Sequence, residues 1–263
     1  MIPAARHNDP SLRPIERLLA VMAQLRNPDG GCEWDLAQSF ATIAPYTIEE
    51  AYELADAITG GDADQIRDEL GDLLLQVVFH AQIAADGGLF DFDAVADTIA
   101  AKMIRRHPHI FGDGHDLPQR AAWEEIKAAE RAQKPDAQSG ALAGVALALP
   151  ALKRAEKLQA RAARVGFDWP DAAGPRAKII AELTELEEAP DKAAQAEEMG
   201  DLLFAVANLA RKLDIDPEAA LAAANRKFEA RFAAMEALAG GSIAGQPLDA
   251  QEALWQRVKA AGG

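Results

Sequence analysis

Several residue types are scarce in this 263-residue chain, and each scarcity excludes a class of structure or function. The single cysteine, Cys32, cannot form a disulfide within the chain, which is typical of a reducing cytoplasm. Lys and Arg number 27 against 42 Asp and Glu, so a net charge of −15 argues against duplex DNA, RNA or an anionic membrane as the main partner. Residues 1–14 lack the apolar core of a signal peptide, and no apolar run reaches transmembrane length. We expect a cytoplasmic protein that contacts no membrane and no nucleic acid polymer.

Alternating β-branched residues are also scarce, whereas alanine and leucine dominate and apolar residues recur at helical spacing. The sequence therefore predicts an all-α fold. Glycine, proline and capping residues divide it into helices, which are expected over about 15–25, 47–60, 62–86, 93–106, 119–134, 151–166, 176–188 and 217–239. A further helix that carries Glu198 and Asp201 is expected after Pro190, and a last one is expected to start at Asp249. Two of these starts carry capping-box patterns, Thr47 with Glu50 and Asp249 with Glu252, and the first would give Glu50 a structural role.

The motif Glu-x-Gly-Asp-Leu-Leu occurs twice, beginning at Glu69 and at Glu198. In each copy the two acids stand three residues apart, so a helix presents both on one face. A single such pair is usually part of a solvated face. The second copy favours a functional site instead, because carboxylates beside an apolar run are costly to bury unless they meet a cation or a donor.

Further residues repeat in register with these acids, which indicates duplication of one domain rather than a solenoid. The matched sets are Glu50 and Glu53 with Glu182 and Glu185, Glu69 and Asp72 with Glu198 and Asp201, Lys102 and Arg106 with Lys227 and Arg231, and Trp123 and Lys127 with Trp255 and Lys259. We expect an N-terminal domain over 1–134, a linker over 135–150 that begins with small and polar residues, and a C-terminal domain over 151–263.

Two helices that each carry an acid pair bring four carboxylates into one small volume, where they repel one another unless cations lie between them. Hard cations with oxygen ligands are the natural choice. A ferritin-like di-iron site needs Glu-x-x-His, whereas Asp72 and Asp201 stand at the third position and none of the five histidines lies in the second half. The pattern favours Mg²⁺ or Mn²⁺ over iron, and His107 and His109 are interpreted as loop or packing residues.

Basic side chains accompany the acids in the second half. Lys227 and Arg231 share a helical face, and Lys259 follows Trp255 by one turn. Cations on one side of a carboxylate-bound metal suit a polyphosphate. Each basic residue alone would be interpreted as solvated, and its register with the acids favours a site. Trp169 and Trp255 could stack on a base or simply pack, and the sequence leaves both open. The chain has no glycine-rich phosphate loop of the Walker type.

Specific strings connect these features to a known family. Glu49-Glu50-x-x-Glu53 followed by Glu69-x-x-Asp72 matches the EExxE…ExxD signature of the all-α nucleoside triphosphate pyrophosphohydrolases, and the chain resembles the tandem-domain MazG family among them. The wider matching strings are Gly31-Cys32-Glu33-Trp34-Asp35, Thr42-Ile43-Ala44-Pro45-Tyr46-Thr47, Arg105-Arg106-His107-Pro108-His109-Ile110-Phe111 and Val165-Gly166-Phe167-Asp168-Trp169. The resemblance covers about residues 15–259. It departs at Ala181, which replaces the first glutamate of the signature in the second half.

The resemblance implies hydrolysis of a nucleoside triphosphate between its α and β phosphates, with Mg²⁺ as cofactor and nucleotide-pool house-cleaning as the role. It also implies a homodimer whose helices pack as four-helix bundles, with catalysis in the C-terminal half. The roles implied there are metal binding by Glu182, Glu185, Glu198 and Asp201, general-base catalysis by Glu182 or Glu185, and substrate binding by Lys227, Arg231, Trp255 and Lys259. A second candidate site in the N-terminal half consists of Glu49, Glu50, Glu53, Glu69, Asp72, Lys102, Arg106, Trp123 and Lys127.

Two other functions stay open at this point. One is an enzyme with the same scaffold and a single substrate, such as a phosphoribosyl-ATP or dUTP pyrophosphohydrolase. The other is a non-enzymatic helical module that binds a nucleotide or a partner protein. The paired acids argue against the second, because binding an anion gains nothing from four carboxylates without a metal.

Overall fold

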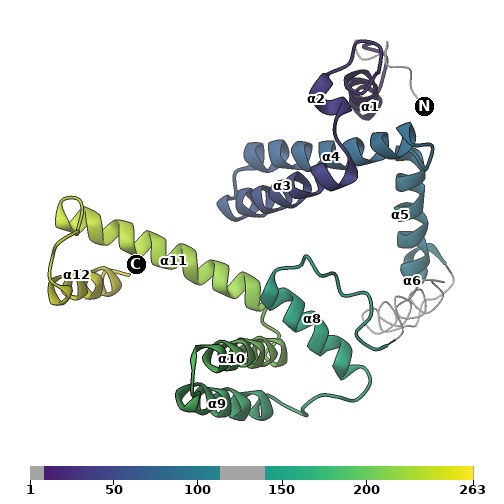
Figure 1. Ribbon diagram of the computed structural model, residues 1–263. Coiled ribbons are helices and arrows are strands. Elements are labelled where there is room, and N and C mark those ends of the chain that lie inside the picture. The colour runs from purple at the N-terminus through teal and green to yellow at the C-terminus, as the bar shows by residue number, and fades with distance from the viewer. Residues whose placement is uncertain (1–8, 113–139, 263) are drawn as a thin grey trace. The chain divides into compact units, whose positions relative to one another are not determined.

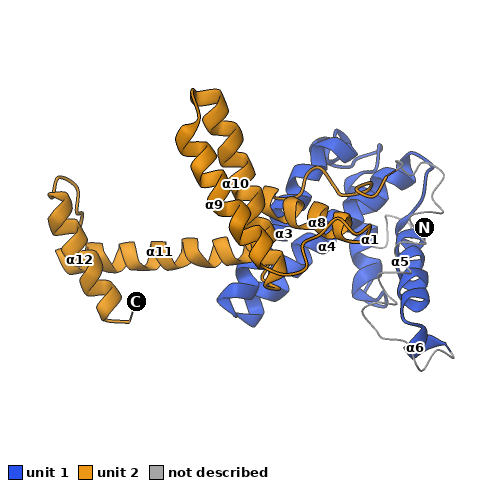
Figure 2. Ribbon diagram, turned by 90° about the horizontal axis from the view of Figure 1, so that it is seen from below, with its two compact units in different colours: residues 1–130 blue, residues 131–263 orange. Residues whose placement is uncertain are grey.

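The computed structural model describes residues 9–112 and 140–262, and every regular element within these ranges is a helix. The predicted all-α fold is therefore confirmed. The chain divides into two compact units, residues 1–130 and 131–263 (Figure 2). The helix expected over 119–134, with Trp123 and Lys127, lies outside the described residues. No described helix combines the length and the apolar character that crossing a membrane requires.

The first unit is built around a pair of long helices. Its described elements are α1 (Pro14–Leu25), α2 (Glu33–Leu36), α3 (Phe40–Gly60), α4 (Ala63–Asp86), α5 (Phe92–Arg106) and α6 (Pro108–Phe111). A tight turn joins α3 to α4, with Gly61 in the left-handed conformation (φ 77°) and the Asp62 side chain capping α4. The two helices consequently lie side by side (Figure 1).

The start of α3 differs from the expectation. The helix begins at Phe40, where the side chain of Ser39 accepts from the backbone of Thr42 and that of Thr42 accepts from Ser39. This reciprocal cap starts the helix upstream of Pro45, which is tolerated inside it at the loss of one backbone hydrogen bond. The predicted capping box at Thr47 is therefore wrong, and Glu50 has no capping role.

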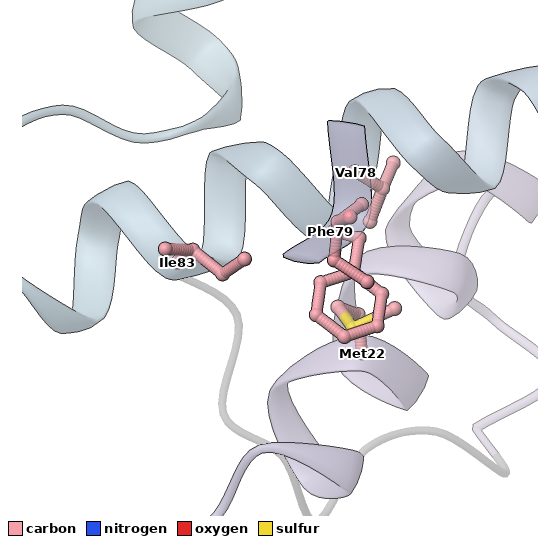
Figure 3. Close-up of a cluster of buried hydrophobic side chains, with 5 residues drawn as sticks. Met22, Val78, Phe79 and Ile83 are labelled. Atoms are coloured by element: carbon pink, nitrogen blue, oxygen red, sulfur yellow. The ribbon is translucent and has the colours of Figure 1, made fainter. Parts of the chain in front are cut away.

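A small hydrophobic core holds α3 and α4 against α1. Its buried members are Met22, Ile43, Val78, Phe79 and Ile83. Figure 3 shows Met22 beneath Phe79, with Val78 close by on the same helix. Each fully buried side chain of this size stabilises the fold by about 1.5–3 kcal/mol. This core fixes the helices on which the N-terminal acids stand.

The second unit repeats the paired helices and adds a long one. Its elements are α8 (Ala151–Ala163), α9 (Ala173–Glu188), α10 (Lys192–Lys212), α11 (Pro217–Ala239) and α12 (Leu248–Ala260). The α9 and α10 helices pack along each other, and α8 packs on α10. Side-chain caps by Asp191 and Asp216 open α10 and α11.

The last helix also begins earlier than expected. Pro247 occupies the N-cap of α12 with φ −59° and ψ 147°, and no side chain caps this helix. The predicted capping box of Asp249 with Glu252 is therefore wrong, because Asp249 already lies within the first turn. There its negative charge interacts favourably with the positive N-terminal end of the helix dipole. The helix packs on α11 through a second cluster, formed by Met235, Ile243 and Val258 with partly buried neighbours that include Trp255.

Candidate active site

The acids of the second unit converge between α9 and α10. Glu182 and Glu185 come from α9 and Glu198 from α10, and one carboxylate oxygen of each lies within 4.8 Å of the others. Oxygen ligands about 2.1 Å from Mg²⁺ in octahedral geometry lie roughly 3 to 4 Å from one another. The three side chains therefore fit a small hard cation. Asp201, one turn beyond Glu198, faces the same volume, since its charge raises the pKa of Glu198.

This acid cluster is electrostatically strained without a cation. Partial burial, followed by repulsion from Glu185, Glu182 and Asp201, raises the pKa of Glu198. Glu182 is only 1% exposed and lies beside Glu198, and a hydrogen bond between the two also raises the pKa of Glu198. The charge of Glu182 is compensated by an ion pair with the ammonium of Lys178, and hydrogen bonding to Glu182 raises the pKa of that lysine.

A similar cluster forms in the first unit. Carboxylate oxygens of Glu50 on α3 and of Glu69 and Asp72 on α4 also lie within 4.8 Å of one another. Burial first, and then the charges of Asp72 and Glu53, raise the pKa of Glu50. The amide of Gln76 donates to Glu50 at 3.4 Å. Thus the predicted acid pairs come together in both halves.

The two clusters differ in their cations. In the second unit Lys178 precedes Glu182 by four residues, and the position four residues before Glu50 holds Tyr46. Among the described residues, no lysine or arginine forms an ion pair with Glu50, Glu69 or Asp72. As far as the described residues show, the first cluster has no counterpart of the Lys178 ammonium.

A cavity of about 680 Å³ opens beside the second cluster. Lys178, Glu182 and Asp201 lie on its wall. The remaining lining is largely apolar and aromatic, with four polar side chains, and consists of Leu142, Leu158, Gln159, Ala162, Gly166, Phe167, Asp168, Trp169, Phe204, Ala205, Asn208 and Arg211. A largely apolar cavity with a few convergent polar groups is the usual form of a small-molecule site.

The loop before α9 closes one side of this cavity and is held by charge. Asp168 pairs with Arg211 and Lys212 of α10, and Arg211 above all lowers the pKa of Asp168 to about 2. Trp169 packs over Gly174, where an added Cβ would lie 2.1 Å from the indole Cδ1. Glycine at this position is what lets the tryptophan line the cavity.

In the first unit a core residue stands at the position equivalent to Asn208. Counted from the acid pairs, Phe79 stands ten residues after Glu69, as Asn208 stands ten residues after Glu198. Phe79 is 4% exposed, its ring lies edge-on to that of Trp34 at 6.3 Å, and the guanidinium of Arg26 stacks over it at 5.6 Å. An aromatic core residue thus occupies the position where the second unit has a pocket-lining amide.

The predicted substrate-binding residues lie on other helices. Lys227 and Arg231 are on α11, and Trp255 and Lys259 are on α12. The Trp255 ring lies 5.5 Å from that of Phe228 and contributes to the α11–α12 cluster. Packing is thus established for Trp255, and contact of these four residues with a nucleotide stays a prediction. In the first unit Lys102 and Arg106 are on α5, and Glu49 is exposed on α3.

Comparison with known proteins agrees with the duplicated arrangement. Residues 38–111 match the MazG nucleotide pyrophosphohydrolase domain, and residues 150–228 match phosphoribosyl-ATP pyrophosphohydrolase. The chain is 48% identical to the nucleoside triphosphate pyrophosphohydrolase of Escherichia coli K12 over 259 residues, covering 94% of this chain and 98% of the relative. The chain belongs to the MazG family.

Two further relatives extend the MazG family assignment. The nucleoside triphosphate pyrophosphohydrolase/pyrophosphatase MazG of Thermotoga maritima is 45% identical, with 93% of this chain and 95% of the relative covered. The uncharacterized protein YabN of Bacillus subtilis is 42% identical, and the match covers 91% of this chain and half of that protein. The prediction of two tandem MazG-like domains is confirmed, since each half matches a domain of this kind.

Sequence reasoning missed several residues of this candidate site. The sequence did contain a signal for Lys178, because this lysine precedes Glu182 by four residues, and residues at i and i+4 share a helical face. Asp168 stands in one of the family-matching strings, and Asn208 and Arg211 follow Asp201 by seven and ten residues on the same face of α10, so these three also carried a local signal. Gln159 carried none, because it reaches the cavity from α8, and its separation from the other lining residues follows no helical period.

Proposed function

We propose that this chain hydrolyses nucleoside triphosphates to the monophosphate and pyrophosphate at the acid cluster of its second unit. The observation that carries the proposal is the junction of two chemically different regions. Three convergent carboxylates and an ammonium adjoin a largely apolar cavity of nucleoside size. The first region suits a metal and a triphosphate, and the second suits a base. The names of the relatives support the same reaction.

Glu182, Glu185, Glu198 and Asp201 are the residues that would hold Mg²⁺, with Mn²⁺ as an alternative. When bound, a divalent ion supplies charge neutralisation of the phosphate oxygens and Lewis-acid activation. The convergence of Glu182, Glu185 and Glu198 supports this assignment, because three carboxylates so close together repel one another unless a cation lies between them.

The chain's own groups divide the remaining work. Lys178 would neutralise phosphate charge when Glu182 holds the cation, and Lys227, Arg231 and Lys259 would add positive charge from α11 and α12. Glu185 is exposed and is the better candidate for orienting and deprotonating the attacking water, because the charge of Glu182 is already paired. Attack in line on the α phosphorus then releases pyrophosphate.

The first unit is proposed to serve assembly rather than turnover, since Phe79, a core residue, stands where the second unit has the cavity-lining Asn208. Apolar side chains remain exposed on the paired helices of both units, such as Tyr52 and Leu70 in the first and Ile180 and Leu203 in the second. Pairing of such faces in a homodimer would complete four-helix bundles. Light scattering of the purified protein tests the dimer.

The domain limits and linker expected at 135–150 belong to the same proposal.

A second candidate is a single-substrate enzyme, favoured by the match of residues 150–228 to phosphoribosyl-ATP pyrophosphohydrolase. A substrate panel separates the two. Broad turnover of nucleoside triphosphates supports a cytoplasmic house-cleaning role in the nucleotide pool. Turnover confined to phosphoribosyl-ATP or to dUTP supports the narrower enzyme.

The decisive experiment incubates the purified protein with each common NTP and dNTP, with and without Mg²⁺, and resolves the products by chromatography. Monophosphate and pyrophosphate, abolished by EDTA, are expected. Nucleoside diphosphate and phosphate would show cleavage between the β and γ phosphates and would contradict the proposed reaction. Binding of nucleotide at saturating Mg²⁺ without any product would instead support a non-enzymatic binding module.

A further inference from the structure

The amide of Gln159 on α8 is buried and its orientation is fixed by its surroundings. The side chain is 6% exposed, and its Nε2 donates to the backbone carbonyl of Phe204 on α10 at 2.8 Å. A carbonyl oxygen can only accept, so the nitrogen must face α10 and Oε1 must face the other way. That oxygen is buried, and no described group donates to it.

Gln159, the residue with this unsatisfied acceptor, lies on the wall of the 680 Å³ cavity. An acceptor that is buried without a partner destabilises the empty protein. A ligand that brings a donor to this position would remove the deficit. The orphaned oxygen therefore identifies one feature of the cavity's occupant, which is an N–H or O–H group.

A second amide of the cavity is oriented by charge. The Oδ1 of Asn208 accepts from Nε and Nη2 of Arg211 at 2.9 and 2.7 Å, and Arg211 is itself held by Asp168. The Asn208 nitrogen is therefore turned away from the guanidinium and is available as a donor. The cavity thus combines one fixed acceptor and one fixed donor within apolar walls.

We propose that Gln159 reads the base of the nucleotide by accepting an N–H from its Watson–Crick edge, while Asn208 donates to the neighbouring acceptor. This inference rests on the proposed function. Every standard base carries a donor next to an acceptor on that edge, so the pair accepts all of them and rejects a base that lacks the donor. The flat apolar walls formed by Phe167, Trp169 and Leu158 suit a base ring better than a sugar.

The test compares kcat/KM of the wild-type protein for ATP and for purine riboside triphosphate, which lacks the 6-amino donor and keeps the N1 acceptor. We expect a preference for ATP of about tenfold to a hundredfold. In Gln159→Leu the preference should fall to within about threefold, through loss of ATP turnover rather than gain with the analogue.

Gln251→Leu is the matched control. This side chain makes the same kind of contact, from Nε2 to the carbonyl of Gln246 at 2.9 Å, on α12 and outside the cavity lining. It should preserve the wild-type preference. Thermal unfolding checks that each variant folds. If Gln159→Leu does not fold, the wild-type ratio of kcat/KM for ATP and purine riboside triphosphate still tests the inference.

Equal turnover of ATP and the analogue by the wild type would overturn the inference. So would discrimination that follows removal of the 2′- or 3′-hydroxyl of ATP and disappears in Gln159→Leu, because the acceptor would then contact the sugar. Absence of turnover with every nucleotide would instead reject the proposed function. The base preference would then be measured by calorimetric titration with ATP and with purine riboside triphosphate. Equal affinities for the two would contradict base recognition by Gln159.

Discussion

The carboxylate of Glu182 is buried against the ammonium of Lys178, one helical turn earlier on α9. This ion pair compensates a charge that would otherwise be unmatched inside the acid cluster. The equivalent turn of α3 offers Tyr46 before Glu50. The duplicated halves thus keep the same acids and differ in the cation beside them.

Replacement of Lys178 should separate metal binding from turnover. In Lys178→Met the ammonium no longer competes for Glu182, so Mg²⁺ should bind more tightly, and kcat/KM should fall about tenfold to a hundredfold because phosphate charge is less well neutralised. Isothermal titration with Mg²⁺ and steady-state kinetics measure the two effects. Lys192→Met, which removes the same charge at the start of α10, is the control. Weaker Mg²⁺ binding in Lys178→Met would contradict the proposed competition.

A pair of matched substitutions tests which half is catalytic. Asp201→Asn should reduce Mg²⁺-dependent hydrolysis by on the order of a hundredfold or more, as expected for loss of one carboxylate at a catalytic ion. Asp72→Asn, the same change at the corresponding position of the first unit, should leave activity within about threefold. Pyrophosphate release reports both. The reverse pattern would move the site to the first half.

The charge of Glu198 should oppose folding when no metal is present. The pKa of the Glu198 carboxyl is higher in the folded protein than in the unfolded chain. Its contribution to the stability of the folded protein is therefore present at pH values below its unfolded pKa and is lost as pH rises through its folded pKa. At neutral pH without metal, Glu198→Gln should therefore raise Tm. The same variant should lose most of the Mg²⁺-induced rise in Tm that we expect of the wild type. Glu197→Gln, its neighbour on α10, should retain that rise, and scanning calorimetry with and without EDTA compares the three proteins.

The ion pairs of Asp168 predict the opposite pH dependence. Arg211 and Lys212 lower the pKa of Asp168 to about 2, so its contribution is present above the unfolded value near 3.8 and is lost as pH falls toward 2. Asp168→Asn should cost on the order of 1–2 kcal/mol at pH 7, after allowance for its partial exposure.

Urea unfolding of wild type and Asp168→Asn at several pH values measures this contribution. The difference in the free energy of unfolding should be constant above about pH 5 and shrink between about pH 4 and pH 2. A difference that stayed constant through this window would assign the loss to packing of the loop rather than to charge.

The helical architecture was accessible from local sequence patterns, with errors where two local signals competed. Thr47 and Glu50 form a valid capping pattern, yet Ser39 and Thr42 form another one upstream, and the longer helix prevails. At α12, the N-cap position is held by Pro247 and not by Asp249, and no side chain caps the helix. The short helices α2 and α6 were not predicted, because one turn carries too little periodicity to be recognised.

The sequence by itself determined the all-α fold, the duplication and the pairing of the acids, because i, i+3 and i+4 spacing places side chains on a face whatever surrounds the helix. Only the tertiary structure decided that a cavity adjoins the second acid cluster and that Phe79, the equivalent of Asn208, is buried in the core of the first unit. A cavity depends on the volumes of side chains brought together from α8, α10 and the loop before α9. Those separations obey no helical period, so the orphaned oxygen of Gln159 became visible only once the helices had packed.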